Sequence, residues 1–248
     1  MSNQNIYDNE EFFNGYKELR EKEICLNDLL EQPAMSEMIP DLKGKTVLDL
    51  GCGYGKNCID FVNRGAEKVI GIDISEKMLE VAKTESSHEK ISYIRMSMTD
   101  ISSLNMKFDF VYSSLALHYI EDFPKLMKDI SDLLTNGGQL LFSQEHPIMT
   151  AAIDKNNSHF NYDENKNRVS YTFSDYNRPG QRKVYWYVDG VIKYHRPMGQ
   201  LLTDIIRSGL ALEEIVEPVP SQWAIDKLPT ITKEFIKPNF LIVKAVKR

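Results

Sequence analysis

Three closely spaced glycines, Gly51, Gly53 and Gly55, follow a short apolar run at residues 46–50. Glycines in such a turn let a ligand approach the backbone closely, as in many nucleotide-binding proteins. The spacing is G-x-G-x-G, so the dinucleotide fingerprint G-x-G-x-x-G fails at Lys56, and no G-K-[ST] follows to make a P-loop. The turn therefore predicts a nucleotide-like ligand without a pyrophosphate cradle. The alternative is a purely structural strand-to-helix turn.

An acidic residue closes the next apolar run. Asp73 follows the glycine turn by about 20 residues, the spacing at which a carboxylate accepts hydrogen bonds from the hydroxyls of a ribose. Ser75 stands where a helix cap is expected, and Asp73 can also cap that helix. We expect ribose binding, with capping as a role that can coexist with it. The glycine turn and Asp73 together indicate an adenosine-like ligand.

Acid–base chemistry at the same edge would fall to histidines. His146 follows the fifth expected strand and His195 ends an expected hairpin, so these two are candidate catalytic bases, needed only if an acceptor must lose a proton. His118, after the fourth strand, also faces the expected crevice, where packing or capping suits it equally well. The sequence has no helical H-x-x-x-H pair and no cysteine–histidine cluster, so no metal site is expected.

A parallel sheet would bring these residues together, and the order of the elements predicts one. Short apolar runs alternate with amphipathic segments, as in βαβ units, and ligands bind where the carboxyl ends of such strands meet. The expected strands are 46–50, 68–72, 91–96, 108–113, 138–144, 211–217 and 240–247, and the expected helices are 56–64, 75–84, 122–134 and 199–208.

Three segments lie outside this alternation. Residues 9–32 have helical spacing of apolar side chains, and we expect Pro33 to end that helix. Residues 147–198 interrupt the rhythm after the fifth strand, and we expect an antiparallel insert whose hairpin turns at Asp189 and Gly190. Residues 218–238 contain four prolines and are expected to form a loop.

The composition is that of a globular protein and excludes several function classes. Of 248 residues, 42% are hydrophobic and 27% are charged, and the formal net charge is −6. An acidic chain lacks the positive field of a nucleic-acid binder, no apolar run is long enough to span a bilayer, and the polar N-terminal residues do not form a signal peptide. Three cysteines give no disulfide framework. We expect a soluble, cytoplasmic protein with no nucleic-acid or membrane partner.

Several motifs occur in the order of one known family. With D-L-G-C-G-Y-G at 49–55, G-I-D-I-S at 71–75, F-D-F-V at 108–111 and G-G at 137–138, the sequence resembles the class I S-adenosylmethionine-dependent methyltransferases, most closely their bacterial small-molecule branch. The resemblance covers residues 40–145. It implies an α/β fold with a doubly wound, Rossmann-like seven-stranded sheet whose last strand is antiparallel, and S-adenosyl-L-methionine as co-substrate.

The resemblance also implies which residues contact the cofactor. Gly51 and Gly53 would lie under its methionine part, Asp73 on the ribose, and Ile74 and Met78 beside the adenine. Asp49 either orders the glycine loop or contacts the cofactor amine. The expected cofactor contacts are Tyr16, Arg20, Asp49, Gly51, Cys52, Gly53, Asp73, Ile74, Met78, Ser97, Met98, Thr99, Ser113 and His118.

Two of these contacts depart from the family or leave alternatives open. Relatives often carry an acid after the third strand, but Ser97 occupies that place, so the adenine contact would come from its hydroxyl or from the backbone of Met98. The helix around Tyr16 and Arg20 resembles a lead-in that covers the cofactor. Arg20 either pairs with the cofactor carboxylate or is a solvated helix charge.

The predicted function is methyl transfer to a small-molecule acceptor. The N-P-P-Y or D-P-P-Y motif of DNA amino-methylating relatives is absent after the fourth strand. Two alternatives keep the cofactor site: a catalytically silent cofactor-binding or scaffold protein, and an enzyme that transfers another group from a related sulfonium. A third is an NAD-dependent oxidoreductase, which Lys56 disfavours because it stands where the dinucleotide fingerprint needs glycine.

The predicted organisation is a helical lid at 1–40, a cofactor domain at 41–146 and 199–248, and an inserted cap at 147–198. The cap would carry substrate specificity, or it would be a dimerisation arm, which leaves a homodimer open.

Overall fold

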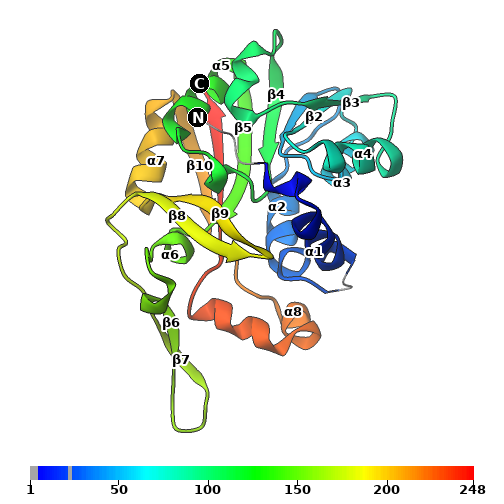
Figure 1. The fold of residues 1–248 in the computed structure, drawn as a ribbon. Helices are drawn as coiled ribbons and strands as arrows, with labels where there is room; N and C mark the ends of the chain where they lie inside the picture. The colour runs from blue at the N-terminus through cyan, green and yellow to red at the C-terminus, as the bar shows by residue number, and fades with distance from the viewer. Residues whose placement is uncertain (1–4, 22–23) are drawn as a thin grey trace.

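A seven-stranded sheet forms the centre of the molecule (Figure 1). The computed structural model describes residues 5–21 and 24–248, apart from the side chains of residues 16, 17 and 19–21. The strand order is β10-β11-β5-β4-β1-β2-β3, and β11 runs antiparallel to both of its neighbours, whereas the other pairs are parallel. This confirms the predicted Rossmann-like sheet with an antiparallel last strand. The strands are β1 Thr46–Leu50, β2 Lys68–Asp73, β3 Ile91–Arg95, β4 Phe108–Ser113, β5 Leu134–Glu145, β10 Leu210–Val216 and β11 Phe240–Lys247.

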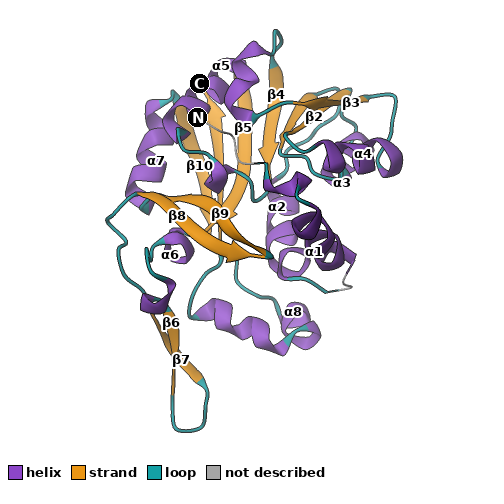
Figure 2. Ribbon diagram, viewed as in Figure 1, coloured by secondary structure: helices purple, strands orange, loops and turns teal. Residues whose placement is uncertain are grey.

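Helices cover both faces of the sheet (Figure 2). The central strand β1 is buried on both sides: Leu48 and Leu50 pack in the cluster with α5 and α7, and Val47 packs in the cluster with α2 and α3. A strand buried on both faces favours the continuous apolar run seen here. The helices are α1 Glu10–Glu21, α2 Gln32–Met38, α3 Lys56–Asn63, α4 Glu76–Glu85, α5 Phe123–Leu133, α6 Pro147–Thr150, α7 Met198–Arg207 and α8 Gln222–Lys227, with shorter 3₁₀ or π turns η1 Ile6–Asp8, η2 Asn27–Glu31, η3 Met98–Ser103, η4 Leu117–Tyr119, η5 Lys155–Asn157 and η6 Pro229–Phe235.

Pro33 does not end the N-terminal helical segment, so that prediction was wrong. Pro33 lies in the first turn of α2, which continues directly from the π turn η2. The Gln32 amide donates to the Asn27 carbonyl, so the helical segment passes from the π turn into α2 at this place, and Pro33, which has no amide to donate, is accommodated there.

The insert after β5 contains two hairpins instead of one. β6 His159–Tyr162 pairs with β7 Arg168–Thr172, and β8 Gly180–Trp186 pairs with β9 Val188–His195. In Figure 1 the first hairpin projects away from the sheet, and the second crosses the sheet's lower end toward α1. The expected turn was misplaced: the chain reverses at Tyr187, which has a φ of 58°, and Asp189 and Gly190 lie inside β9.

The segment 218–238 is not the loop that its prolines suggested. It forms α8 and η6, and Ala224 and Ile231 pack there on Leu29, Leu30 and Phe240. Within the described ranges, no helix has the length and apolar content that crossing a bilayer requires.

Candidate active site

The glycine loop joins β1 to α3 at the carboxyl edge of the sheet. The amides of Gly51 and Cys52 both donate to the Ile72 carbonyl at 2.9 Å, which fixes the loop against β2. Gly51 has a φ of 73°, and a Cβ there would lie 2.9 Å from the Ala116 Cβ. Gly53 has a φ of 52°, but a Cβ there would meet nothing within 4 Å. Packing therefore requires glycine at position 51, whereas Gly53 borders open space of the kind a ligand fills.

Asp73 holds the loop and the start of α4 together. Its Oδ2 accepts from the Gly53 amide at 2.9 Å, and its Oδ1 accepts from the Ser75 amide at 2.8 Å. Burial raises the pKa of Asp73, although these two bonds oppose the rise. Each carboxylate oxygen has a second lone pair, so Asp73 can accept two more hydrogen bonds. Ser75 caps α4 through the amide of Met78 at 3.1 Å.

A cavity of about 550 Å³ opens next to the ends of β2 and β3, and Ile74, the residue after Asp73, is part of its lining. Ser97 lines it, and its hydroxyl lies 2.8 Å from that of Thr99. The Met98 Cε packs close to Gly51. Met78, expected beside the adenine, is almost fully buried in α4. The cavity is lined by Asn5, Ile74, Arg95, Met96, Ser97 and Asp100.

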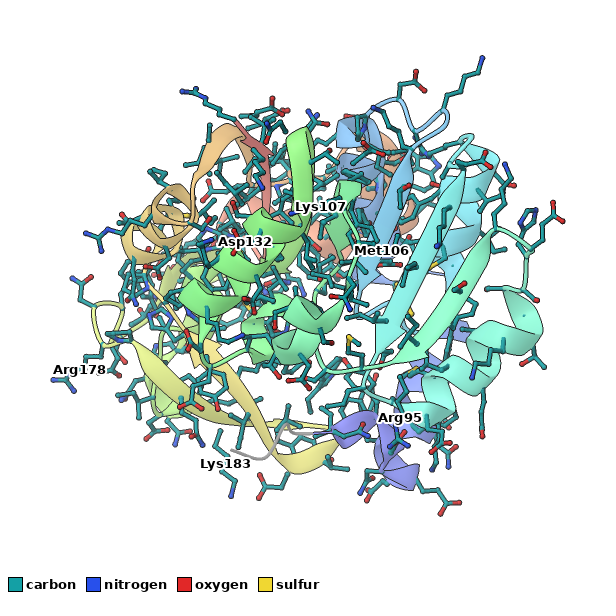
Figure 3. The ribbon with its side chains drawn as sticks, turned by 90° about the horizontal axis from the view of Figure 1, so that it is seen from above. Arg95, Met106, Lys107, Asp132, Arg178 and Lys183 are labelled. Atoms are coloured by element: carbon teal, nitrogen blue, oxygen red, sulfur yellow. The ribbon has the colours of Figure 1, made fainter. Side chains whose placement is uncertain are left out.

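The N-terminal segment, predicted to be a lid, lies against this cavity through Asn5 and Asp8, two residues that the sequence did not single out. Asp8 Oδ1 accepts from the Ser75 hydroxyl at 2.6 Å and from the Lys77 amide at 3.3 Å, and Asp8 Oδ2 lies 3.7 Å from Arg95 Nη2. Figure 3 shows Arg95 beside this segment. Partial burial acts to raise the pKa of Asp8, but the hydrogen bonds from Ser75 and Lys77 outweigh it and leave the pKa below its ordinary value. No local motif marks Asp8. The side chains of Tyr16 and Arg20 lie outside the described part of the chain.

Asp49 lies behind the glycine loop, at the centre of a buried thiol cluster. Cys58 Sγ donates to Asp49 Oδ2 at 3.4 Å. Burial, assisted by the charge of Asp73, raises the pKa of Asp49 to about 7. A Cβ on Gly71 would lie 2.9 Å from the sulfur atoms of both Cys52 and Cys58. Since Asp49 is nearly inaccessible, this geometry favours loop ordering over contact with a ligand amine.

The ends of β4 and β5 form the other half of the edge. The Ser113 hydroxyl donates to the Leu50 carbonyl at 2.8 Å, so it ties β4 to β1 and is not free for a ligand. Burial lowers the pKa of His118 to about 3, with Lys193 and Arg196 acting in the same direction and Glu145 against them. His118 is therefore neutral near pH 7.

A buried carboxylate organises the chain just beyond β4. Glu31 Oε1 accepts from the hydroxyls of Ser114 and Ser143 at 2.8 and 2.5 Å. The Leu115 amide donates to Ser143 Oγ at 3.0 Å, and Leu115 has a φ of 52°. A left-handed conformation at a branched residue is held only by its surroundings and is frequent at functional sites. This network was missed, because it joins segments distant in sequence.

The two histidines expected as bases do not have free ring nitrogens. His146 Nδ1 accepts from the Ile148 amide at 3.1 Å, and its Nε2 lies 2.7 Å from Glu217 Oε1. His195 Nδ1 lies 2.8 Å from Thr150 Oγ1, and its Nε2 lies 2.8 Å from the Tyr176 carbonyl. Burial lowers the pKa of both rings. These bonds hold both rings in place, and a catalytic role for either histidine stays a prediction.

The hairpin of β8 and β9 reaches the N-terminal helix and closes this side of the site. The Phe12 ring lies 5.1 Å from that of Trp186 and 5.9 Å from that of Tyr187, measured between centroids. A Cβ on Gly15 would come within 2.6 Å of the Tyr187 ring, so the close approach of α1 requires glycine there. The lead-in helix and the insert therefore meet each other at this edge.

Comparison with known proteins assigns this architecture. A family model described as "Methyltransferase domain" matches residues 41–206. A solved S-adenosylmethionine-dependent methyltransferase from Mesorhizobium loti is 37% identical, with a TM-score of 0.79, over 88% of this chain and 97% of that one. The chain belongs to the class I S-adenosylmethionine-dependent methyltransferases. A second solved structure, that of a "putative S-adenosylmethionine dependent methyltransferase" from Listeria monocytogenes, is 33% identical, with a TM-score of 0.80, over 88% of this chain and 96% of that one. An uncharacterized protein of Haemophilus influenzae is 37% identical over 227 residues, 88% of this chain and 89% of the relative.

Membership identifies the co-substrate as S-adenosylmethionine and the chain as an enzyme. The site fits that molecule, because Gly53 borders open space where a side chain would intrude, and Asp73 retains acceptor capacity beside it. The NAD-dependent rival is thereby excluded.

Proposed function

We propose that the enzyme transfers a methyl group from S-adenosylmethionine to a small molecule bound at the ends of β4 and β5, beneath the β8–β9 hairpin. The observation that carries the proposal is the position of the hairpin, which packs through Trp186 on Phe12 and so covers the edge next to the cofactor loop. A covered site suits a small acceptor better than a nucleic acid or a folded protein.

In this proposal Asp73 receives the ribose, Ile74 and Ser97 contact the adenine, and Gly51 and Gly53 lie beneath the methionine part. The sulfonium supplies an already activated methyl group, so the chain's contribution is to align the acceptor and exclude water. Glu31 would hold the Ser114–Leu115 backbone at the border between the two halves. Because burial lowers the pKa of His118 to about 3, its ring would be too weak a base to accept a proton from the acceptor.

The segment 1–40 serves as a lid and 147–198 as a cap in the same proposal. The contacts of Asp8 with Ser75 and Lys77 support the lid, and those of Trp186 and Tyr187 with Phe12 support the cap. A cytoplasmic location is also part of the proposal, since the three cysteines carry free thiols. A dimerisation arm remains the alternative for the insert.

Methyl transfer from radiolabelled S-adenosylmethionine to a cell extract tests the proposal. The extract is divided by ultrafiltration into a small-molecule fraction and a macromolecular fraction. We expect label only in products of the small-molecule fraction. Label in the macromolecular fraction alone would contradict a small acceptor. Cofactor binding with no labelled product in either fraction would support the silent binding protein.

The double variant Trp186→Ala with Tyr194→Ala tests whether the insert is a substrate cap or a dimerisation arm. As a cap, the insert should lose methyl transfer while S-adenosylhomocysteine binding is kept. If the double variant stays active and only shifts to a smaller species by light scattering, the insert is an interface.

A further inference from the structure

The side chain of Lys193 is held at the end of β5 in an unusual setting for a lysine. Its Nζ lies 2.5 Å from Glu145 Oε1 and above two aromatic rings, 5.0 Å from the centroid of Trp186 and 5.9 Å from that of Tyr119. Lys193 is only 7% exposed. Lysines are almost never buried to this extent unless they are paired or used.

The surroundings of Lys193 belong to the half of the site that the cofactor residues leave unused. Glu145 is the last residue of β5, and Tyr119 belongs to η4, which follows β4. Trp186 ends β8 at the tip of the hairpin cap. The cofactor loop and Asp73 follow β1 and β2 instead. The ammonium therefore lies at the carboxyl edge where the proposed function expects the acceptor.

The local charge at this place is positive, although the whole chain is acidic. A second buried lysine, Lys237, lies with its Nζ 4.9 Å from the ring centroid of Tyr171 and 5.6 Å from that of Phe160. Burial acts to raise the pKa of Glu145, yet the charge and the hydrogen bond of Lys193, with the charge of Lys237, leave it below its ordinary value. The carboxylate of Glu145 thus experiences a surplus of positive charge.

Neighbouring charges cancel this positive charge only in part. Arg196 donates to the backbone carbonyls of Ile120, Glu121 and Tyr194. Glu234 lies near Lys237 and opposes its charge, while it also accepts from the amide and the side chain of Asn239 at 2.9 Å. An ammonium group would be repelled here, whereas an anion would be attracted.

We propose that Lys193 binds an anionic group of the methyl acceptor, a carboxylate or a phosphate, and that Glu145 holds the ammonium in position until the acceptor arrives. The inference rests on the proposed function. An ammonium has three hydrogen-bond donors, so Lys193 can contact the acceptor anion without losing Glu145. The rings of Trp186 and Tyr119 keep water from the pair and hold the ammonium by cation–π contact.

The test uses a small-molecule extract divided by anion exchange at pH 7 into a retained and an unretained fraction. Each fraction is incubated with the full-length enzyme and radiolabelled S-adenosylmethionine. We expect labelled product from the retained fraction. Treating that fraction with phosphatase distinguishes the two anions, because a phosphate acceptor is lost and a carboxylate acceptor remains.

Variants then test whether Lys193 is responsible for the preference for an anionic acceptor. Lys193→Met should lower labelling at least tenfold, Lys193→Arg should restore part of it, and both should bind S-adenosylhomocysteine within twofold of the unaltered enzyme. Lys183→Met is the matched control, since Lys183 is an exposed lysine of the same hairpin that points outward in Figure 3; its labelling should not change. Glu145→Gln removes the carboxylate that holds the ammonium in position, so half-maximal labelling should need more extract.

Three results would overturn the inference. Label confined to the unretained fraction contradicts an anionic acceptor but leaves methyl transfer to a small molecule intact. Equal labelling by Lys193→Met and the unaltered enzyme contradicts the role of Lys193. No label from either fraction overturns the proposed function and this inference with it.

Discussion

Replacing Asp73 by asparagine removes a negative charge and one acceptor oxygen while keeping the size of the side chain. In the structure the two oxygens each accept one backbone amide, from Gly53 and from Ser75. Asparagine can satisfy only one of these amides, and its own amide group would face the other donor. The ribose hydroxyls would also lose an ionised acceptor.

The expected cost can be worked out from these contacts. Loss of a hydrogen bond to a charged group costs about 1–3 kcal/mol, which corresponds to a roughly 5- to 150-fold weaker dissociation constant. The loss in unfolding free energy should be smaller, because burial already raises the pKa of Asp73 and so penalises its charge in the folded state. We therefore expect Asp73→Asn to weaken S-adenosylhomocysteine binding strongly and to lower the melting temperature only slightly.

Titration calorimetry with S-adenosylhomocysteine measures this effect, and Asp49→Asn provides the control. Asp49 is an acid at the same edge, nearly inaccessible and bonded to Cys58. The dissociation constant of Asp49→Asn for S-adenosylhomocysteine should lie within twofold of that of the unaltered enzyme. If Asp73→Asn binds equally well, the carboxylate does not receive the ribose and serves only to hold the loop.

Three further variants test other parts of the site. Gly53→Val should abolish S-adenosylhomocysteine binding, because a side chain would enter the open space beside the loop; near-normal affinity would mean that this space is not the binding site. Asp8→Ala should weaken binding about three- to tenfold, through loss of about 0.5–1.5 kcal/mol of hydrogen bonding to Ser75 and Lys77; unchanged calorimetry would refute the lid. Asp49→Asn should raise stability above pH 7: burial raises the folded-state pKa of Asp49 to about 7, so the unaltered enzyme loses stability as the pH rises from about 4 to about 7. The variant should lack that loss and be more stable at pH 8 by about 1–4 kcal/mol. Denaturation curves that give the same difference in unfolding free energy between the two proteins at pH 5 and at pH 8 would contradict this.

The sheet was predictable because its signals are local. The apolar runs of β1 and β2, the glycines between them and the Ser75 cap each depend on neighbours in sequence. The same locality explains two errors. Pro33 was expected to end the helical segment, but it lies where the π turn η2 passes into α2, and the sequence has no signal for that change of hydrogen bonding. Asp189 and Gly190 are a strong turn signal, but the chain reverses two residues earlier, at Tyr187, whose ring packs closely against Gly15 in α1, a contact distant in sequence.

The candidate site was predictable only on its cofactor side. Glycine spacing and the strand-end acid are linear motifs, so they identified the loop and Asp73. The contacts of Asp8, Glu31 and Lys193 join segments that are distant in sequence, and no pattern near these residues marks them. His146 was expected at the crevice from its place after β5, but Glu217, 71 residues away, occupies its ring nitrogen.

A crystal structure of the enzyme with S-adenosylhomocysteine tests the central claim most directly. We predict both ribose hydroxyls within hydrogen-bond distance of Asp73, the adenine in the cavity lined by Ile74 and Ser97, and the sulfur turned toward the ends of β4 and β5 beneath the hairpin. A complex in which Asp73 does not touch the ribose, or in which the sulfur faces away from β4 and β5, would contradict the account.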